Sequence, residues 1–464
     1  MRPPVIEELR SLVGREYVMD KLEDRICYSC DATFRSGVPE VVVRPGSVEE
    51  IMGIVRLASR RGIPITPRGA STGLSGGAVP IKGGICLDLT RLNRILEIDV
   101  VNRVATVEPG VITDDLASAV SRAGLFYPPD PSSSKVCTIG GNIAECAGGP
   151  RGVKYGVTRD YVLGLEVVLP SGDLVQVGNP VDGEMSGPDW TMLLVGSEGT
   201  LGIVTRIFLR LVDKPATKKT LLAVFETLED AATSVSTLIA SGTIPTTLEI
   251  MDNLTIRAVE DYLKVGLPVA AEAILLIEVD GAPSAVEKHC DHVIAVCKRC
   301  NASDIQVAET EDQADKLWRA RRAISPACGR INPTKISEDA TVPRSQLPAM
   351  VRRIKEIAAK YDLKMVVFGH AGDGNLHPNI LTNKHNLEEM QRVERAIEEL
   401  FRCTLELGGT LSGEHGIGYM KAPFLEWETG RDGFALARQV KDSVDPKGLL
   451  NPGKMFSAIS QQIT

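Results

Sequence analysis

The sequence of 464 residues has no long apolar run, no excess of basic residues and no leader-like N-terminus. No stretch approaches the roughly 20 apolar residues that a membrane-spanning helix needs, so we expect no direct membrane span. The net charge is −8, with 52 Lys and Arg mixed among 60 Asp and Glu, which argues against nonspecific nucleic-acid binding. The first residues lack the apolar segment of a secretory signal. We therefore expect a cytoplasmic protein, with about two or three domains of roughly 150 residues.

The two commonest nucleotide-binding motifs are also missing. The loop Pro67–Gly77 follows a predicted strand at 63–66 and reads Pro-Arg-Gly-Ala-Ser-Thr-Gly-Leu-Ser-Gly-Gly. It is neither the G-x-G-x-x-G pattern nor a Walker A motif, which argues against a Rossmann domain. Its glycines and hydroxyls suit a loop whose backbone N–H groups face an anion, although a plain connecting loop would look similar. A capping box at Ser47 begins a predicted helix through Arg60, which completes a βαβ unit with the strand at 40–45.

Ten cysteines are present, and two pairs have the spacing of metal ligands. These pairs are Cys27 with Cys30 and Cys297 with Cys300. A zinc ribbon needs both pairs near one another, and they lie far apart in the sequence. We therefore expect reduced thiols without a structural metal.

Histidine is scarce, and three of the six His lie in two glycine-lined stretches. Residues 368–377 read Phe-Gly-His-Ala-Gly-Asp-Gly-Asn-Leu-His and follow an apolar strand, so His370 and His377 bracket a predicted turn. Residues 413–418 read Gly-Glu-His-Gly-Ile-Gly. Two His and a carboxylate can hold a borderline metal ion, and a further His can transfer a proton. The spacing alone does not decide how Glu414 and His415 divide these roles.

A basic helix is predicted over 315–325, with Trp318, Arg321 or Arg322, and Ser325 on one face. It is either a solvated basic face or a guanidinium held to bind a carboxylate with two hydrogen bonds. Further along, Lys335 could make a second contact to such a carboxylate, although a surface ion pair with the following acidic residues is the simpler expectation.

The second half of the chain repeats a strand-helix-strand pattern. Strands are predicted at 220–226, 246–251, 273–279 and 304–308, with helices at 231–240 and 285–300. This pattern favours an antiparallel sheet with helices on one face, as in ferredoxin-like domains. The polar segment 212–219 has the composition of a linker.

Together, several segments resemble one family. They are Arg44-Pro45, the Pro67–Gly77 loop, Pro129-Asp-Pro131, Thr138–Asn142, Ala147–Gly149 and Gly196–Val204. They resemble the FAD-binding domain of the vanillyl-alcohol-oxidase and p-cresol-methylhydroxylase superfamily. Within it, the chain is similar to the branch of the glycolate oxidase D subunit and the D-lactate and D-2-hydroxyglutarate dehydrogenases. A run of consecutive His in the related alkylglycerone-phosphate synthases is replaced here by Gly-Glu-His-Gly, which argues against ether-lipid synthesis.

The resemblance implies an α+β fold. It combines a two-subdomain FAD-binding domain of the p-cresol-methylhydroxylase type with a ferredoxin-like, antiparallel-sheet cap that binds substrate. The expected segments are an N-terminal helical part (1–35), the FAD-binding domain (36–215), the cap with the metal site (216–424) and a C-terminal part that returns to the FAD domain (425–464). FAD would be bound non-covalently. The residues implied in binding it are Pro67, Arg68, Gly69, Ala70, Ser71, Thr72, Gly73, Leu74, Ser75, Pro131, Thr138, Gly140, Gly141, Asn142, Ala144, Gly148, Gly149, Glu198, Gly202, Ile203, Val204 and Asn451.

The resemblance also separates the roles that spacing left open. It implies that His370, His377 and Glu414 bind a divalent metal, Zn or else Mn or Fe, and that His415 takes the proton. Substrate contacts would come from Arg321 and Asn379, with Ser325 and Lys335 as further candidates. The implied reaction oxidises a D-2-hydroxyacid, with D-lactate or glycolate first, to the 2-oxoacid by hydride transfer to flavin N5. The metal would favour loss of the hydroxyl proton, since a bound cation lowers the pKa of such groups.

The same branch implies an electron acceptor, such as electron-transfer flavoprotein, a quinone or an iron–sulfur partner subunit. The alternative function is a flavoprotein subunit of a larger electron-transfer complex, glycolate-oxidase-like or bifurcating, that is inactive alone. A homodimer and membrane association through partner subunits are left open.

Overall fold

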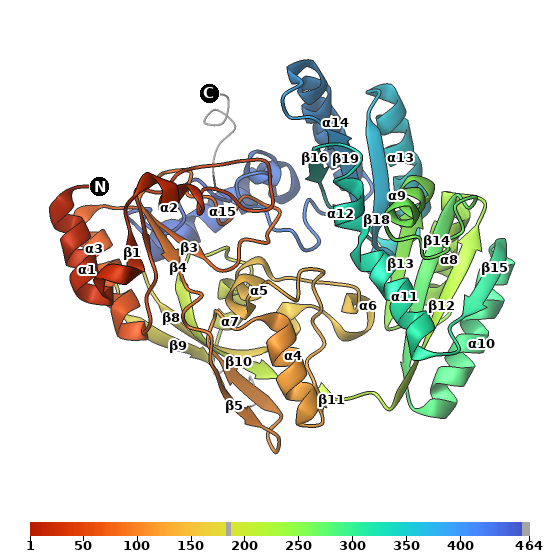
Figure 1. Cartoon of the computed structure of the whole chain (residues 1–464), viewed down its shortest axis with the longest axis horizontal. Coiled ribbons are helices and arrows are strands. Elements are labelled where there is room, and N and C mark those ends of the chain that lie inside the picture. The colour runs from red at the N-terminus through yellow and green to blue at the C-terminus, as the bar shows by residue number, and fades with distance from the viewer. Residues whose placement is uncertain (182–186, 457–464) are drawn as a thin grey trace. The chain divides into compact units, whose positions relative to one another are not determined.

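The computed structural model describes residues 1–181 and 187–456, and the chain divides into two compact units (Figure 1). The first unit contains Met1–Ala147, Val157–Lys214 and the C-terminal part from Glu414. The second contains Gly148–Gly156 and Pro215–Gly413. The boundaries expected at 35/36, 215/216 and 424/425 stay a prediction.

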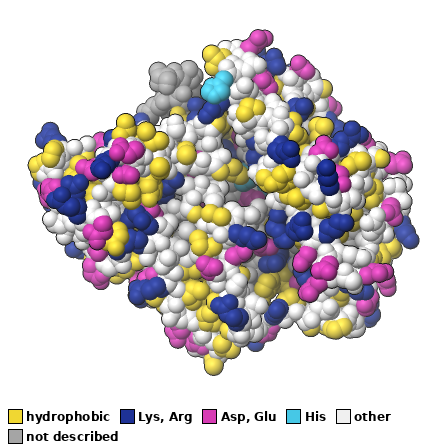
Figure 2. Space-filling model, in the orientation of Figure 1, with side chains coloured by type: hydrophobic (Ala, Val, Ile, Leu, Met, Phe, Trp, Pro, Cys, Tyr) yellow, Lys and Arg dark blue, Asp and Glu magenta, His cyan; other side chains and the backbone are white. Residues whose placement is uncertain are grey.

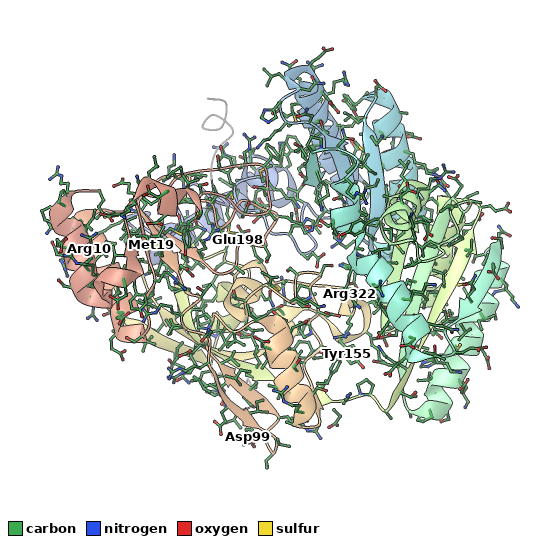
Figure 3. All side chains as sticks on the ribbon, in the orientation of Figure 1. Arg10, Met19, Asp99, Tyr155, Glu198 and Arg322 are labelled. Atoms are coloured by element: carbon green, nitrogen blue, oxygen red, sulfur yellow. The ribbon has the colours of Figure 1, made fainter. Side chains whose placement is uncertain are left out.

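Two main sheets form the first unit. In the four-stranded sheet β2 and β3 run parallel to β4, and in the five-stranded sheet all neighbours are antiparallel. The first sheet, in order, is β1 (Val18–Met19), β2 (Val41–Val43), β4 (Ile85–Asp88) and β3 (Ile65–Arg68). The second is β5 (Ile95–Asp99), β6 (Val104–Val107), β10 (Ile203–Arg210), β8 (Val162–Val168) and β9 (Leu174–Gly178). A short pair joins β7 (Leu125–Phe126) to β11 (Val212–Asp213). Asp99, labelled in Figure 3, ends β5 and accepts hydrogen bonds from the N–H groups of the following turn.

The predicted βαβ unit is present, with α3 (Val48–Arg61) between β2 and β3. Ser47 caps α3 by accepting from the N–H of Glu50 at 3.3 Å. The Glu50 carboxylate accepts from the N–H of Gly46 at 2.6 Å rather than from Ser47, so the predicted capping box is shifted by one residue. The buried face of α3 packs against α1 (Pro3–Val13) and the four-stranded sheet in one hydrophobic core.

The remaining helices of the first unit are short except for the last. They are α2 (Leu22–Ile26), α4 (Thr113–Arg122), α5 (Ile139–Glu145), α7 (Trp190–Leu194) and α15 (Leu425–Val444), which is kinked at Gly430. After α15 the chain returns to β3. Leu450 forms a parallel bridge with Ile65, and the N–H of Asn451 donates to the carbonyl of Ile65 at 2.7 Å.

An antiparallel sheet dominates the second unit. Its order is β15 (Ala302–Val307), β12 (Thr217–Phe225), β14 (Ala273–Gly281), β13 (Thr247–Asp252), β18 (Lys364–His370), β19 (Asn375–Thr382) and β16 (Thr334–Ser337), with β17 (Ala340–Thr341) also beside β19. The first four strands have the spatial order fourth, first, third, second of their order in the chain. This is the ferredoxin-like arrangement that the repeat predicted.

Helices cover both faces of this sheet, not one as the pattern predicted. One set is α9 (Asn253–Leu263), α11 (Glu311–Arg322) and α12 (Ile324–Cys328); the other is α8 (Leu228–Ala240), α10 (Pro283–Arg299), α13 (Leu347–Lys360) and α14 (Leu387–Glu406). The first set shares a core with Met251 and Val366. The alternate residues Ile250 and Val367 are buried as well, and successive side chains of a strand point to opposite faces.

The predicted basic helix is wrong at its C-terminal end. Instead of continuing through Ser325, α11 ends at Arg322, and α12 begins at Ile324. Pro326 explains the break, because it has no N–H to donate to the carbonyl of Arg322 and its ring crowds that carbonyl. Ser325 therefore belongs to a separate short helix from Trp318 and Arg321.

Among the described residues, none of the helices has the length and apolar character required to cross a lipid bilayer. Lys and Arg side chains are interspersed with Asp and Glu over the face shown in Figure 2.

Candidate functional site

The two histidines of the second unit lie on one hairpin, β18–β19. His370 ends β18 opposite Asn375, and His377 lies within β19 opposite Phe368. Directly paired residues share a face of a sheet, and so do residues two apart, so these four side chains lie on one face. The two imidazole rings are 5.1 Å apart at nearly a right angle, and both are buried. The turn predicted between them is shorter, because His377 is already inside the second strand.

Gly374 closes that turn in a left-handed conformation, with φ of 80°. A Cβ atom there would lie 2.0 Å from the carbonyl oxygen of Val342. The turn therefore requires glycine for its backbone angle and because the backbone of Val342 lies so close to it.

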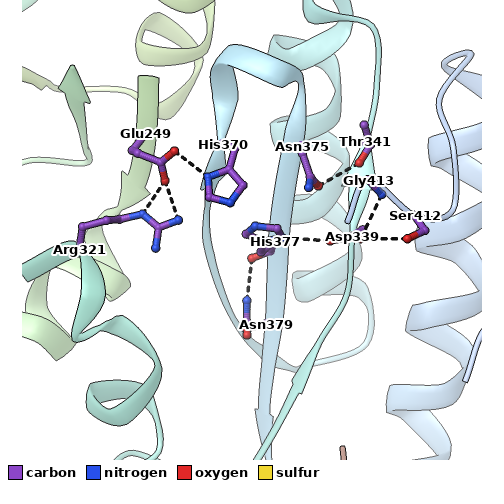
Figure 4. A network of polar contacts seen from close by, with 10 residues as sticks. All are labelled: Glu249, Arg321, Asp339, Thr341, His370, Asn375, His377, Asn379, Ser412 and Gly413. Carbon is purple, nitrogen blue, oxygen red and sulfur yellow. Dashed lines mark hydrogen bonds and ion pairs between the residues drawn. The ribbon is translucent and has the colours of Figure 1, made fainter. Parts of the chain in front are cut away.

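Glu249 of β13 pairs in register with His370 and binds it through Oε1, 2.6 Å from Nδ1 (Figure 4). Its other oxygen, Oε2, accepts from Nε of Arg321 at 2.6 Å, and Nη2 of the same guanidinium forms an ion pair with it at 2.6 Å. Glu249 is fully buried. Burial by itself would raise the pKa of this carboxyl, but Arg321 and His370 outweigh it and hold the pKa below its usual value.

Arg321 is the arginine that faces the site, since its side chain is 4% exposed whereas Arg322 lies on the surface. The guanidinium carbon of Arg321 is 5.2 Å from the centre of the Phe368 ring. Glu249 uses Nε and Nη2, and within the described part of the chain Nη1 has no hydrogen-bond partner. A planar cation fixed in this way can still donate to an anion.

Asp339 holds His377 on the other side of the hairpin. Oδ1 of Asp339 is 3.1 Å from Nδ1 of His377, and Oδ2 accepts from the N–H of Gly413 at 3.0 Å and from Ser412 Oγ at 3.4 Å (Figure 4). Asp339 is fully buried. Glu414 and His415 follow Gly413 directly in the chain and are assigned to the first unit. Their joint role with the two histidines stays a prediction.

Asn379 shares the face of His377, two residues along β19, and is fully buried. Its Nδ2 donates to the carbonyl of His377 at 2.8 Å, whereas Oδ1 has no hydrogen-bond partner among residues 1–181 and 187–456. A buried amide oxygen without a partner is costly, which makes this atom a candidate for contact with a bound molecule.

Lys335 of β16 donates to Oγ of Ser325 at 2.8 Å. Burial lowers its pKa below the ordinary value. The structure pairs it with no carboxylate of the described residues, contrary to the surface ion pair expected from the sequence. The ammonium group of Lys335 instead lies beside the hydroxyl of Ser325.

The glycine-rich loop of the first unit leaves the end of β3, which includes Pro67 and Arg68. A Cβ on Gly69 would lie 2.3 Å from Oγ1 of Thr138, so the loop packs directly against the start of α5. Ser71 is left-handed, with φ of 57°, and its buried Oγ has no hydrogen-bond partner in the described segments. The guanidinium of Arg68 is occupied by structural contacts, because it donates to the carbonyls of Tyr28, Cys30 and Ala78.

Several other predicted cofactor residues have structural contacts in the same unit. Thr138 caps α5 and accepts from the N–H of Gly141, while Asn142 donates to Thr113. Glu198, labelled in Figure 3, is left-handed, and its N–H donates to the carbonyl of Ala144 at 2.9 Å. Its Oε2 is buried without a partner among the residues described.

Asn451 ties three of these segments together. Its Nδ2 donates to the carbonyls of Gly77 and Glu198, at 2.9 Å and 2.8 Å. Of the remaining predicted positions, Pro131 is buried, Gly202 precedes β10, which begins with Ile203 and Val204, and Gly148 and Gly149 are assigned to the second unit.

Sequence reasoning missed the buried charged groups around both sites. Glu249 and Asp339 were passed over as ordinary residues of a strand and an acidic stretch. The available signal was an acid at Glu249 between the apolar residues Leu248 and Ile250 of β13. In the first unit, Lys454 donates to the carbonyls of Gly77 and Val79, and burial lowers its pKa to about 8. Burial and the neighbouring Glu198 raise the pKa of Glu145, which accepts from Ser75.

These first-unit residues fit FAD. The loop after β3 offers glycines and backbone N–H groups, and the buried hydroxyl of Ser71 would gain a partner from a pyrophosphate oxygen. The imidazole and carboxylate side chains of the second unit suit a divalent metal, since both kinds of group are ligands for Zn, Mn or Fe.

Two family models match the chain. The FAD binding domain matches residues 39–178, and the C-terminal domain of FAD linked oxidases matches residues 214–455. Together they account for most of the length.

Relatives match over nearly the whole chain. Glycolate oxidase subunit GlcD of Bacillus subtilis is 51% identical, covering 98% of this chain and 97% of its own. D-lactate dehydrogenase of Anaerostipes hadrus and D-2-hydroxyglutarate dehydrogenase of Xanthomonas citri pv. viticola are each 36% identical, over 98% of this chain and 97% and 98% of theirs.

Solved structures confirm the fold. Substrate-bound p-cresol methylhydroxylase has a TM-score of 0.82 at 19% identity, covering 99% of this chain and 98% of that one. The 4-ethylphenol oxidase of Gulosibacter chungangensis has a TM-score of 0.81 at 21% identity, with the same coverage. The fold is thus the expected α+β combination of a p-cresol-methylhydroxylase-type FAD domain and an antiparallel-sheet domain. The chain belongs to the FAD-linked oxidases, in the branch of glycolate oxidase subunit GlcD and the D-lactate and D-2-hydroxyglutarate dehydrogenases.

Proposed function

We propose that this protein oxidises a D-2-hydroxyacid, D-lactate or glycolate first, to the 2-oxoacid with FAD as the redox cofactor. One observation carries the proposal: Arg321 of α11 contacts Glu249 and Phe368 on the same sheet face that presents two imidazoles and the unpartnered Oδ1 of Asn379. A 2-hydroxyacid needs a cation for its carboxylate and polar groups for its hydroxyl. Relatives named for glycolate, D-lactate and D-2-hydroxyglutarate support the same substrate class.

Arg321 would bind the substrate carboxylate. Its guanidinium is already oriented by Glu249 and Phe368, so little side-chain freedom is lost on binding. Lys335 and Ser325 would add a second polar contact, and Asn379 would bind the substrate through its amide oxygen.

His370, His377 and Glu414 would hold a divalent metal, with Zn preferred from the ligand types and Mn or Fe as alternatives. When bound, this ion would favour the ionised form of the substrate hydroxyl. His415 would accept the hydroxyl proton, because an imidazole exchanges protons readily near neutral pH.

FAD, when bound, would take up the two electrons of the oxidation as a hydride equivalent. The chain itself would position this cofactor through the loop 67–75, Glu198 and Asn451, and the substrate through Arg321. The hydrophobic and buried surroundings of the two histidines would keep water from the reacting groups.

The experiment is a substrate panel on the purified chain. We expect a flavin spectrum, reduction of an artificial dye with D-lactate or glycolate and much less with L-lactate, and a stoichiometric divalent metal in the same sample. A protein without a flavin spectrum contradicts the proposal. The variant His377→Ala should lose both metal and turnover; if it loses the metal and keeps its turnover, the metal role is wrong.

A second candidate is a subunit of a larger electron-transfer complex that is inactive alone. It is favoured by the names of two relatives, which are described as glycolate oxidase subunits. Electron-transfer flavoprotein, a quinone or an iron–sulfur subunit would then be the acceptor. Bleaching of the flavin by substrate without turnover of the dye supports this alternative, whereas sustained dye reduction by the chain alone opposes it.

A further inference from the structure

Two buried carboxylates, Glu249 and Asp339, each contact the Nδ1 atom of one histidine of the hairpin. We propose that Glu249 and Asp339 are positioning residues that hold His370 and His377 as Nδ1–H tautomers, so that the Nε2 atom of each ring carries the lone pair that a divalent cation requires. This inference extends the metal role proposed above and rests on it only for the identity of the ligand.

The hydrogen-bond inventory of Glu249 fixes the tautomer of His370. Oε2 of Glu249 must accept, because a guanidinium has only donors and both Nε and Nη2 of Arg321 are 2.6 Å away. Oε1 of the same ionised carboxylate can only accept as well, so Nδ1 of His370, at 2.6 Å, must carry the hydrogen. A neutral imidazole has one N–H, and Nε2 therefore keeps its lone pair.

Asp339 repeats this arrangement at His377 with different partners. Its Oδ2 accepts from the backbone N–H of Gly413 at 3.0 Å, and Oδ1 lies 3.1 Å from Nδ1 of His377. The anchoring donor is now a peptide group, and it belongs to the residue directly before Glu414. Asp339 thus orients His377 and also contacts the backbone directly before Glu414, the third proposed ligand.

Both histidines contact a buried carboxylate through Nδ1, although unrelated groups hold the two carboxylates in place. The carboxylates come from different strands, and one is anchored by an arginine and the other by a peptide N–H. Each lies at 0% exposure, so water does not compete for the hydrogen bonds. Packing of two buried histidines would not require both rings to have the same nitrogen bonded to a carboxylate. Binding one cation through both Nε2 atoms does require the hydrogen of each ring to be on Nδ1, and a carboxylate acceptor at each Nδ1 holds it there.

An amide in place of either carboxylate should reverse the tautomer. In Glu249→Gln the amide oxygen must stay towards Arg321, so the NH₂ group faces Nδ1 of His370. In Asp339→Asn the oxygen must stay towards the N–H of Gly413, and the NH₂ group faces Nδ1 of His377. A ring that accepts at Nδ1 carries its hydrogen on Nε2 and has no lone pair for a metal.

The test uses the full-length flavin-loaded protein, stripped of metal with a chelator and labelled with ¹⁵N at histidine. Imidazole nitrogen shifts should show Nδ1–H for two histidines of the wild type. Glu249→Gln should convert one of them to Nε2–H, and Asp339→Asn the other. Unchanged tautomers in both variants, or Nε2–H in the wild type, overturn the inference.

Metal affinity provides a second readout, by titration of Zn²⁺ or Mn²⁺ into the stripped protein. We expect each amide variant to bind about 10- to 100-fold more weakly than the wild type. The matched control is Glu278→Gln, a buried carboxylate of the neighbouring strand β14 that bonds Trp318 and Lys218 but no histidine. It should bind the metal as the wild type does. Equal affinity in all four proteins overturns the inference.

Failure of the metal role is distinguishable from failure of this inference. A wild type that binds neither ion while both histidines show Nδ1–H contradicts the proposed metal site and overturns the link to a cation, although the tautomers stand. If Glu249→Gln does not fold because Arg321 is left buried without a counter-charge, Asp339→Asn still decides the matter, since Asp339 has no arginine among its partners shown in Figure 4 and its Oδ2 accepts from a peptide N–H.

Discussion

Asn379 has a side-chain oxygen that lacks a hydrogen-bond partner in the described chain. This oxygen, Oδ1, is buried, while Nδ2 fixes the side chain to β19. We expect Asn379→Ala to lower kcat/KM for D-lactate about 10- to 100-fold, because a hydrogen bond that involves a charged or strongly polar group contributes roughly 1.5 to 3 kcal/mol. Steady-state kinetics with an artificial acceptor measure this change.

Asn383→Ala is the control for this prediction, since Asn383 lies just beyond β19 and its side chain accepts from the N–H of His385, outside the site. Its kinetics should match those of the wild type. If both variants behave alike, Asn379 does not contact the substrate.

Asp252 allows a prediction on pH and stability. It caps α9 by accepting from the N–H of Thr255, and it also accepts from the N–H of Val367 in β18. Burial raises its pKa to about 6. The unfolded chain has the ordinary value near 3.9, so the folded state binds the extra proton between about pH 4 and pH 6. Asp252 should therefore add stability as the pH falls through this window and lose it as the pH rises.

Urea unfolding of the wild type and Asp252→Asn at several pH values measures this effect. Asparagine still caps a helix but does not titrate. The difference in unfolding free energy between the two proteins should shift in favour of the wild type on going from pH 7 to pH 4.5, by up to about 1.4 kcal/mol per unit of pKa shift. A difference that is constant with pH would show that Asp252 has an ordinary pKa when folded.

At the scale of elements, the hairpin that carries both histidines depends on its turn. We expect Gly374→Ala to reduce the free energy of unfolding by at least about 2 kcal/mol, because alanine disfavours the left-handed angle and its Cβ would clash with the carbonyl of Val342. Chemical denaturation monitored by circular dichroism measures the loss.

Gly242→Ala separates these two causes. Gly242 has nearly the same φ, 82°, but nothing lies within 4 Å of its would-be Cβ. This variant should lose only about 1 kcal/mol, the cost of the angle alone. Equal losses in the two variants would mean that the turn relaxes away from Val342.

Much of the element layout could be predicted from the sequence. The βαβ unit around α3, the strand before His370 and the alternation of strands and helices in the second half all have local signals in periodicity and capping residues. The break at Ala323 was missed because the amphipathic pattern continues across it, and Pro326 was not weighed against that pattern. The anchoring of Arg321 by Glu249 joins residues that are distant in the sequence, and only the packing of α11 against the sheet brings them together. The register of β13 with β18 places His370 beside the same carboxylate.

At the scale of the whole molecule, FAD should contribute to stability. The segments implied in holding it, the loop after β3, Glu198 and Asn451, come from three distant parts of the chain and are linked by hydrogen bonds. We expect removal of FAD to lower the melting temperature and its return to restore it, since a ligand at 100 times its Kd adds about 2.7 kcal/mol. Thermal unfolding with and without added FAD measures this, with FMN as the control that lacks the adenylate.

An unchanged melting temperature after removal of the flavin would contradict this expectation. A full recovery with FMN would show instead that the adenylate half of the cofactor makes no contribution.

The pairing of Leu450 with Ile65 has a consequence for biosynthesis. β3 is synthesised before its neighbour Leu450, and the Asn451 side chain that binds the carbonyl of Gly77 follows that glycine by 374 residues. A nascent chain that stops before residue 451 lacks one wall of the glycine-rich loop. Contacts of such long sequence separation form late in folding. Uptake of the cofactor should therefore follow synthesis of the segment that contains Asn451.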